Sequence, residues 1–237
     1  LRGYEGRGSA IYFGALRWGL LQDYGFSRRV RRPPTDPVNA VLSLLYTFLF
    51  NRVYAAIRQA NLDPYPAFLH VPDYGRHSLV MDLMEEFRVI IADTLTLSLF
   101  NLKILQKDDF HIEHRPPVPA SESWPEGGEG VDVTSDPYGH MTDLDSSDQF
   151  DVPVQRMGEE TMYDLETEDT RGKPAVLLTP GAFRRVIENF ERKMTTEFYY
   201  APEERTITYA DAMVSQAGMY RKVIEGSLKV YQPLLLK

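Results

Sequence analysis

The stretch DPVNAVLSLLYTFLFNRVYAAIRQA, residues 36–60, decides the fold class of this chain. It is apolar on nearly every face of a helical wheel, which is typical of a helix at the centre of a protein. Thr35 or Asp36 supplies an N-cap, and Pro37 suits the first helical turn, where an N–H is not needed. Its aromatic residues, including Tyr46, have the spacing of packing residues. The stretch therefore predicts a central, buried helix.

Apolar segments with helical spacing flank this stretch on both sides. The further helices that they predict cover residues 10–24, 78–106, 180–198 and 209–228. Gly25 is placed to end the first of them, Ser78 is placed as the N-cap of the second, and Thr179-Pro180 starts the third. The only candidate strand is 174–179. We therefore predict an all-α fold.

Residues 111–172 differ in composition from the rest of the chain. They hold sixteen Asp and Glu against three Arg, while the remainder holds 23 Lys and Arg against 18 Asp and Glu. Pro and Gly are frequent here and large apolar residues are few. The conformational entropy lost on ordering this stretch would therefore exceed the free energy gained by burying its apolar surface. We predict a disordered acidic insert over 111–172 within one helical domain, formed by 1–110 and 173–237.

The composition excludes several classes of protein. The chain of 237 residues has no Cys, which excludes disulfides, thiolate zinc sites and thiol nucleophiles. No uninterrupted apolar run of about 18 residues is present, so we predict no membrane partner. The chain starts with Leu1 and has no recognisable signal peptide. We therefore expect a cytoplasmic protein of which this chain is a piece.

One group of residues has the pattern of a metal site. His70 follows an apolar loop, and Asp82, Glu85 and Glu86 follow at helical spacing, so that the three carboxylates can face one side. They lie in an otherwise apolar helix, where buried negative charge needs a cation or hydrogen-bond donors. Carboxylate oxygens with one imidazole suit Mg²⁺ or Mn²⁺.

A structural interpretation of the same residues stays open. Carboxylates near the start of a helix favourably meet its dipole, and Arg76 or Arg88 could pair with them. His70 could be a hydrogen-bonded loop residue. Glu5, between glycines before an apolar helix, either reaches a shared site or is a solvated charge.

A basic cluster follows the first predicted helix. It consists of Arg28, Arg29, Arg31 and Arg32. Such a cluster can bind the phosphate backbone of a nucleic acid, or it can be a solvated helix end. The sequence pattern alone favours neither.

Taken together, these segments resemble the CRISPR-associated adaptation integrases, the family of the first Cas protein (Cas-one). The matching segments are YEGRGSAIYF (4–13), RRPPTDPVNAVLSLLYTFLF (31–50), LDPYPAFLHVPDYGRHSLVMDLMEEFR (62–88), KDDF (107–110), LTPGAFRRVIENFERKM (178–194) and Gln216-Ala217. The resemblance covers nearly all of the chain outside the insert, and the segment around His70 is its most specific part.

The resemblance implies an α-helical catalytic domain that binds Mn²⁺ or Mg²⁺. It implies Glu5, His70 and Glu85 as the metal ligands, and Asp82 as a further acidic residue needed for activity. Arg28, Arg29, Arg31 and Arg32 then become candidate contacts to the DNA backbone.

The implied function is that of a metal-dependent DNA endonuclease and integrase of CRISPR antiviral defence. Members join prespacer DNA to the CRISPR array by attack of a DNA 3′-hydroxyl on a phosphodiester, which is spacer acquisition. The implied partners are double-stranded DNA (prespacer and repeat), a second copy in a homodimer, the small second Cas protein and, in some members, a Cas nuclease of the fourth type.

Two departures from the family pattern concern activity. The β-rich N-terminal domain of the family is missing from these residues, and the acidic insert is longer than expected. The alternative to catalysis is a non-catalytic DNA-binding or assembly scaffold with the same helical shell, in which the carboxylates pair with arginines.

Overall fold

A computed structural model of the chain describes residues 2–31, 33–70, 75–113 and 174–235, with the side chains of 2–5 left out. Arg32 and the predicted insert beyond residue 113 therefore lie outside the described residues. The α-helices among them are α1 (Arg2–Trp18), α2 (Pro37–Gln59), α3 (Ser78–Phe87), α4 (Thr94–Asn101), α7 (Pro180–Met194) and α8 (Tyr209–Ile224). The strands are β1 (Phe110–Glu113), β2 (Ala175–Leu178), β3 (Glu197–Tyr200) and β4 (Arg205–Thr208).

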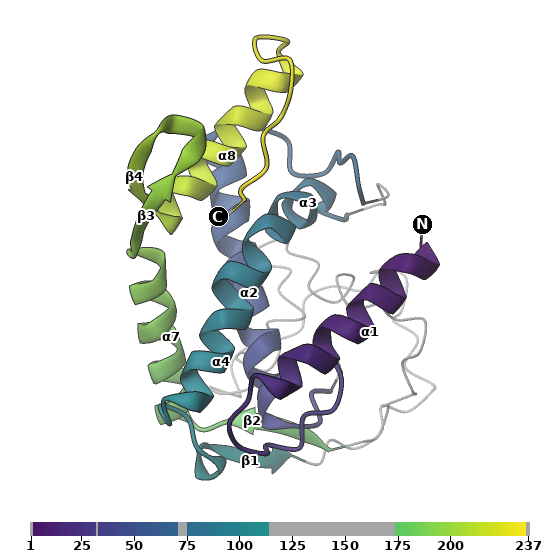
Figure 1. Ribbon diagram of the computed structural model, residues 1–237, viewed down its shortest axis with the longest axis vertical. Coiled ribbons are helices and arrows are strands. Elements are labelled where there is room, and N and C mark those ends of the chain that lie inside the picture. Colours follow the sequence, from purple (N-terminus) through teal and green to yellow (C-terminus); the bar gives the residue numbers. More distant parts are fainter. Residues whose placement is uncertain (1, 32, 71–74, 114–173, 236–237) are drawn as a thin grey trace, which may run out of the picture.

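Helix α2 runs through the centre of the molecule, as its sequence predicts (Figure 1). Asp36 is its N-cap, because the side chain accepts a hydrogen bond of 2.9 Å from the backbone nitrogen of Asn39. The helix packs against α3, α4, α8 and β2. Its buried residues include Val38, Val41, Leu42, Leu45, Leu49, Phe50, Val53 and Ile57. The prediction of a buried central helix is therefore confirmed.

The length and composition of α2 would also allow it to cross a membrane. Polar residues interrupt its apolar positions, so that α2 contains no uninterrupted apolar run of about 18 residues. In this fold more than half of its most apolar window is buried against other helices. The apolar surface of α2 is accounted for by this packing.

The single helix predicted over 78–106 is divided into three parts. α3 leads into a π-helical segment (Arg88–Asp93), which leads into α4. The helical run ends at Asn101, and Lys103 has a positive φ of 57°. Asn101 also fixes the end of α1, because its side chain bonds the carbonyl of Gly19 and the amide of Leu21.

The prediction of an all-α fold is wrong, because the described part of the chain contains two antiparallel sheets of two strands each. β1 pairs with β2, with Phe110 opposite Leu178, and β3 pairs with β4. The candidate strand at 174–179 is confirmed as β2. The other three strands have four residues each, too few to give a clear alternating pattern.

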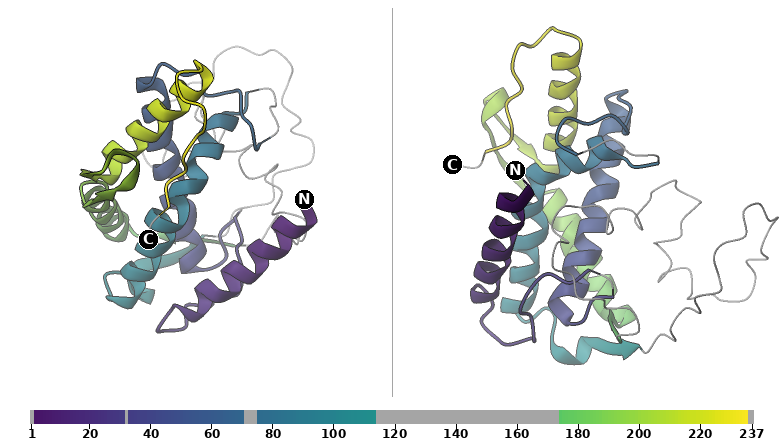
Figure 2. Two further views of the ribbon diagram at one scale, coloured as in Figure 1. Left: turned by 45° about the horizontal axis from the view of Figure 1, so that its top comes forward. Right: turned by 90° about the vertical axis from the view of Figure 1, so that its right-hand side faces the viewer.

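The second half of the fold lies against the same central helix. α7 starts at the predicted N-cap Thr179 but ends at Met194, because the next residues enter β3. α8 follows β4 directly and contacts α2. After α8 the chain turns back toward α3, so that the carboxyl end of the described chain lies near that helix (Figures 1 and 2).

Candidate active site

The loop that precedes α3 is built around the carboxylate of Asp82. Asp82 Oδ2 accepts hydrogen bonds from the backbone nitrogens of Phe68 (2.8 Å) and Leu69 (2.9 Å). Asp82 Oδ1 accepts from the backbone nitrogen of His70 (2.9 Å) and lies 2.7 Å from His70 Nδ1. A residue on the first turns of α3 thus fixes both the backbone of the loop and the imidazole at its end.

These contacts shift the pKa of Asp82 and select one tautomer of a neutral His70. Burial alone would raise the pKa of Asp82, but the hydrogen bonds from the His70 ring and the loop amides outweigh it and lower that pKa. Because the ionised carboxylate only accepts, Nδ1 of a neutral His70 carries the proton and Nε2 has the lone pair. Within the described part of the chain, Nε2 has no hydrogen-bond partner, and the side chain is 17% exposed.

Glu85, the next predicted site residue, has a different environment. Its Oε1 accepts a hydrogen bond of 2.6 Å from Arg88 Nη1, and its side chain is 33% exposed. The guanidinium of Arg88 also lies over the ring of Tyr46, 4.7 Å from the centroid. Burial lowers the pKa of Arg88, but Glu85 and Tyr46 raise it by a larger amount. The pKa therefore lies above its ordinary value, and Arg88 stays charged. The structural interpretation of this carboxylate, in which it pairs with an arginine, is therefore met by Arg88.

Glu86 belongs to another cluster. Its carboxylate accepts from Gln216 Nε2 (2.8 Å), from the hydroxyl of Tyr231 (2.5 Å) and from the backbone nitrogen of Leu234 (2.7 Å). The spacing that lets the three carboxylates face one side does not give them shared hydrogen-bond partners. Helical spacing brings them near each other, but each turns to donors from a different segment.

The structure tests the expected metal ligands only in part. His70 and Glu85 lie on a loop and a helix that contact each other through Asp82. Glu5 lies on α1, and its side chain is outside the described part of the chain. Among the residues that are described, no three His, Asp or Glu side chains form a group that could hold a metal ion.

The arginine cluster does not act as one surface. The guanidinium of Arg29 points inward and donates to Val30 O (2.7 Å), Asn39 Oδ1 (2.9 Å) and Ser43 Oγ (2.9 Å). Burial lowers the pKa of Arg29 to about 10, which leaves it charged at neutral pH. Arg29 therefore connects the loop to α2.

The remaining members of the cluster differ in exposure. Arg28 is exposed, Arg31 is half-buried, and Arg32 lies outside the described residues. Within this cluster, Arg28 is thus the most exposed of the arginines that the structure places.

A buried polar network beside the site was not predicted from the sequence. The hydroxyls of Tyr12 and Tyr46 both donate to the carboxylate of Asp93, at the end of the π-helical segment. Asp93 is 2% exposed. A single carboxylate in the apolar run IIADTLTL was the available signal, since such a group needs buried donors.

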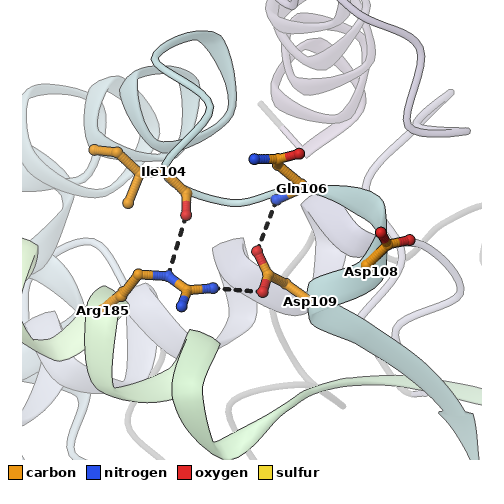
Figure 3. A pocket seen from close by; sticks show the side chains of 5 residues that line it. All are labelled: Ile104, Gln106, Asp108, Asp109 and Arg185. Carbon is orange, nitrogen blue, oxygen red and sulfur yellow. Dashed lines mark hydrogen bonds and ion pairs between the residues drawn. The ribbon is translucent and has the colours of Figure 1, made fainter.

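The KDDF segment forms a shallow polar pocket with α7 (Figure 3). Asp109 pairs with Arg185 and accepts from the backbone nitrogen of Gln106, while Arg185 Nε donates to the carbonyl of Ile104 (3.1 Å). These groups satisfy one another and tie α7 to the segment after α4. Strand β1, which follows the KDDF segment directly, lies at the end of the molecule opposite α3 (Figure 1).

Comparison with known proteins places the chain in a family. Residues 1–120 match the family model described as CRISPR associated protein Cas1. A CRISPR-associated endonuclease Cas1 of Thermus thermophilus is 46% identical over 125 residues, which cover 53% of this chain and 38% of that protein. The match therefore spans well under half the length of this curated relative.

Solved structures show the same fold at low identity. A casposase bound to integration product has a TM-score of 0.64 at 17% identity, covering 99% of this chain and 52% of that chain. A chain of a Cas6-RT-Cas1–Cas2 complex has a TM-score of 0.66 at 20% identity, covering 99% of this chain and 19% of that chain. With a family model that matches half of the chain, the protein belongs to the CRISPR-associated Cas1 family.

Proposed function

We propose that this protein is a metal-dependent DNA endonuclease and integrase of CRISPR adaptation. Membership of the Cas1 family supports a nuclease, since the curated relative bears the name endonuclease. The fold shared with a casposase bound to an integration product supports strand transfer as the form of that chemistry.

The observation that carries the proposal is the His70–Asp82 pair. Metal-binding histidines usually donate their second ring N–H to a carboxylate, which fixes the tautomer and the direction of the ligating nitrogen. Asp82 holds His70 in this way through Nδ1 at 2.7 Å. The donor set of one imidazole nitrogen with the carboxylates of Glu85 and Glu5 fits Mn²⁺ or Mg²⁺.

When bound, the metal would polarise the scissile phosphodiester and stabilise the charge that develops on its oxygens. The reaction needs no covalent protein nucleophile, because a DNA 3′-oxygen forms the new bond to phosphorus. The attacking 3′-hydroxyl gives up its proton as this bond forms; the bond from phosphorus to the outgoing 3′-oxygen breaks, and that oxygen takes up a proton, so that no net proton is gained or lost.

The residues of the chain have distinct roles in this proposal. Asp82 keeps His70 oriented, and Arg88 holds Glu85 on the same helix. Phe68 and Leu69, just before His70, are 79% and 78% exposed. Apolar and aromatic side chains of this kind can contact the faces of unpaired bases close to the reacting phosphate.

The proposed partners follow from the family. We propose that Arg28 contributes to binding of double-stranded prespacer and repeat DNA, and that the protein acts as a homodimer with the small second Cas protein. The presence of Cas2 in the complex named for one structural neighbour supports the last of these. Association with a Cas nuclease of the fourth type stays a prediction from the resemblance.

The non-catalytic scaffold is the second candidate, and one observation favours it. Glu85 already has a cationic partner in Arg88, so its charge does not require a metal. A scaffold of this kind would bind DNA equally well with and without a chelator.

A strand-transfer assay separates the two candidates. It would combine the protein with the second Cas protein, a prespacer duplex, a repeat-containing plasmid and Mn²⁺ or Mg²⁺. We expect joined products that disappear with EDTA, with His70→Ala and with Glu85→Ala. The matched controls are His111→Ala and Glu188→Ala, which remove an exposed imidazole and an exposed carboxylate elsewhere. DNA binding without joining or nicking under either metal would favour the scaffold.

A further inference from the structure

The chain after α8 is fastened to α3 by the carboxylate of Glu86. Glu86 accepts hydrogen bonds from the hydroxyl of Tyr231 and the backbone nitrogen of Leu234, both in the C-terminal segment. It also receives Gln216 Nε2, which donates in addition to the carbonyl of Gln232 at 3.3 Å. Helix α8, the C-terminal segment and α3 are thus joined at one half-buried carboxylate, here called the Glu86 clamp.

Tyr220 of α8 connects this clamp with the loop that carries His70. Its ring meets the ring of Tyr231 edge to face, with centroids 5.6 Å apart. On its other side it meets the ring of Phe68 in the same manner, also at 5.6 Å. Tyr220 therefore lies between a residue of the clamp and a residue whose backbone nitrogen is bound by Asp82.

The hydroxyl of Tyr220 does not explain its position. This oxygen is buried and has no hydrogen-bond partner among the residues that the structure describes. The ring, by contrast, makes edge-to-face contacts of the favourable kind on two sides. The contribution of Tyr220 is therefore that of an aromatic surface.

We propose that Tyr220, supported by the Glu86 clamp, is a positioning residue for His70. Asp82 binds the loop through its backbone nitrogens and the imidazole, and Tyr220 supports it through Phe68. Asp82 and Glu86 are one helical turn apart on α3, so the loop and the clamp are held by the same element. This inference rests on the proposed function, in which His70 is a ligand of the metal.

Such support matters because Phe68 is otherwise largely exposed. A loop without it is tethered by hydrogen bonds to one carboxylate and has more freedom to shift. A displacement of about 1 Å in a catalytic group can cost about a hundredfold in rate.

The test compares three variants of two tyrosines on the same helix. Tyr220→Ala removes the ring contact, while Tyr220→Phe keeps the ring and removes only a hydroxyl without a partner. Tyr209→Ala is the matched control, because Tyr209 is a buried tyrosine of α8 that stacks on Phe198 and not on the loop. It reports the general effect of an aromatic deletion in this helix.

The first measurement is amide hydrogen exchange at Phe68, Leu69 and His70, whose nitrogens bind Asp82. We expect Tyr220→Ala to speed their exchange about tenfold or more, and Tyr220→Phe and Tyr209→Ala to leave it nearly unchanged. Equal protection in all three variants, or equal loss in the two Ala variants, would overturn the inference.

The second measurement is strand transfer by the same variants with the second Cas protein present. We expect Tyr220→Ala to lower kcat about ten- to hundredfold at nearly constant KM for DNA, and Tyr220→Phe to restore it. A Tyr220→Ala enzyme with the kcat of Tyr209→Ala would overturn the positioning role. If the exchange results are as expected but the unmodified protein transfers no strand, the proposed function fails while Tyr220 still supports the loop.

Discussion

The three carboxylates of α3 accept hydrogen bonds from different donors, and this difference separates their roles. Asp82 receives the imidazole and the loop amides, whereas Glu85 receives a single guanidinium. Glu86 receives side-chain and backbone donors from the C-terminal part of the chain. Of the three, Glu85 has the fewest donors, and its side chain is 33% exposed.

Asp82→Asn tests the orientation of His70. The amide would keep one acceptor oxygen and present an NH₂ group to donors, so the loop amides and Nδ1 could not all be satisfied. We expect strand transfer or metal affinity to fall about 10- to 100-fold, as for other carboxylates that orient a ligating histidine. The check is the metal concentration that gives half-maximal activity, and an unchanged value would contradict this role.

Asp93→Asn tests the buried tyrosine network through its dependence on pH. Burial raises the pKa of Asp93 more than the hydrogen bonds from Tyr12 and Tyr46 lower it. The folded protein thus binds this proton more tightly than the unfolded chain, whose Asp pKa is about 3.9. The contribution of Asp93 to stability is complete below that pH and is lost as pH rises through the raised folded value.

The Asn variant does not titrate, and it leaves one tyrosine hydroxyl without a good acceptor. We expect it to cost about 1–3 kcal/mol in unfolding free energy near pH 4. This cost should shrink as pH rises, which urea unfolding between pH 4 and 7 would measure. A cost that grows with pH would show that Asp93 is stabilised in its ionised form.

The sequence located this site without specifying its contacts. The spacing of His70 and Asp82 placed them on a loop and the following helix, where the structure shows them joined. It could not show that Glu86 binds residues of the C-terminal segment, because that contact spans more than a hundred positions along the chain. Helical periodicity shows which residues of a helix share a face. It does not show which distant segment of the chain packs against that face.

At the scale of elements, the same limit explains the mistaken fold class. α2, α7 and α8 carry their own signals, in the form of N-caps followed by apolar periodicity. Strands of four residues obtain their stability from pairing with another segment, and β1 pairs with a strand about sixty residues further on. A local pattern therefore could not predict them.

Arg28 and Arg29 provide a matched pair for testing the connection between α1 and α2. Arg29 donates to Asn39 and Ser43 from a buried position, so Arg29→Ala should lower the unfolding free energy by about 2–3 kcal/mol. Arg28 is exposed, so Arg28→Ala should lower stability less than Arg29→Ala does, and it should weaken DNA binding, with a smaller dependence on salt.

Chemical unfolding and DNA titrations at two or more salt concentrations would check both expectations. The assignment fails if Arg28→Ala unfolds the protein more easily than Arg29→Ala, or if it leaves both DNA affinity and its salt dependence unchanged.

At the scale of the whole molecule, the acidic segment joins two paired strands. Glu113 of β1 lies opposite Ala175 of β2, so the ends of the segment between them are adjacent. A short Gly-containing turn in place of 114–174 should therefore close the sheet and keep the fold. Removing so much negative charge should also strengthen DNA binding.

Thermal unfolding and DNA titration of this deletion variant would test the expectation that 111–172 is an insert. A melting temperature within a few degrees of the parent protein, with tighter DNA binding at low salt, is the expected result. Loss of the cooperative transition would show that the segment is part of the folded core.

The central claim is that His70, oriented by Asp82, belongs to a divalent-metal site. Direct titration with Mn²⁺, followed by calorimetry or by the electron paramagnetic resonance of the free ion, tests it without requiring turnover. The account predicts that the protein binds Mn²⁺, that His70→Ala abolishes this binding, and that His111→Ala preserves it. Equal Mn²⁺ binding by the unmodified protein and His70→Ala would contradict the account.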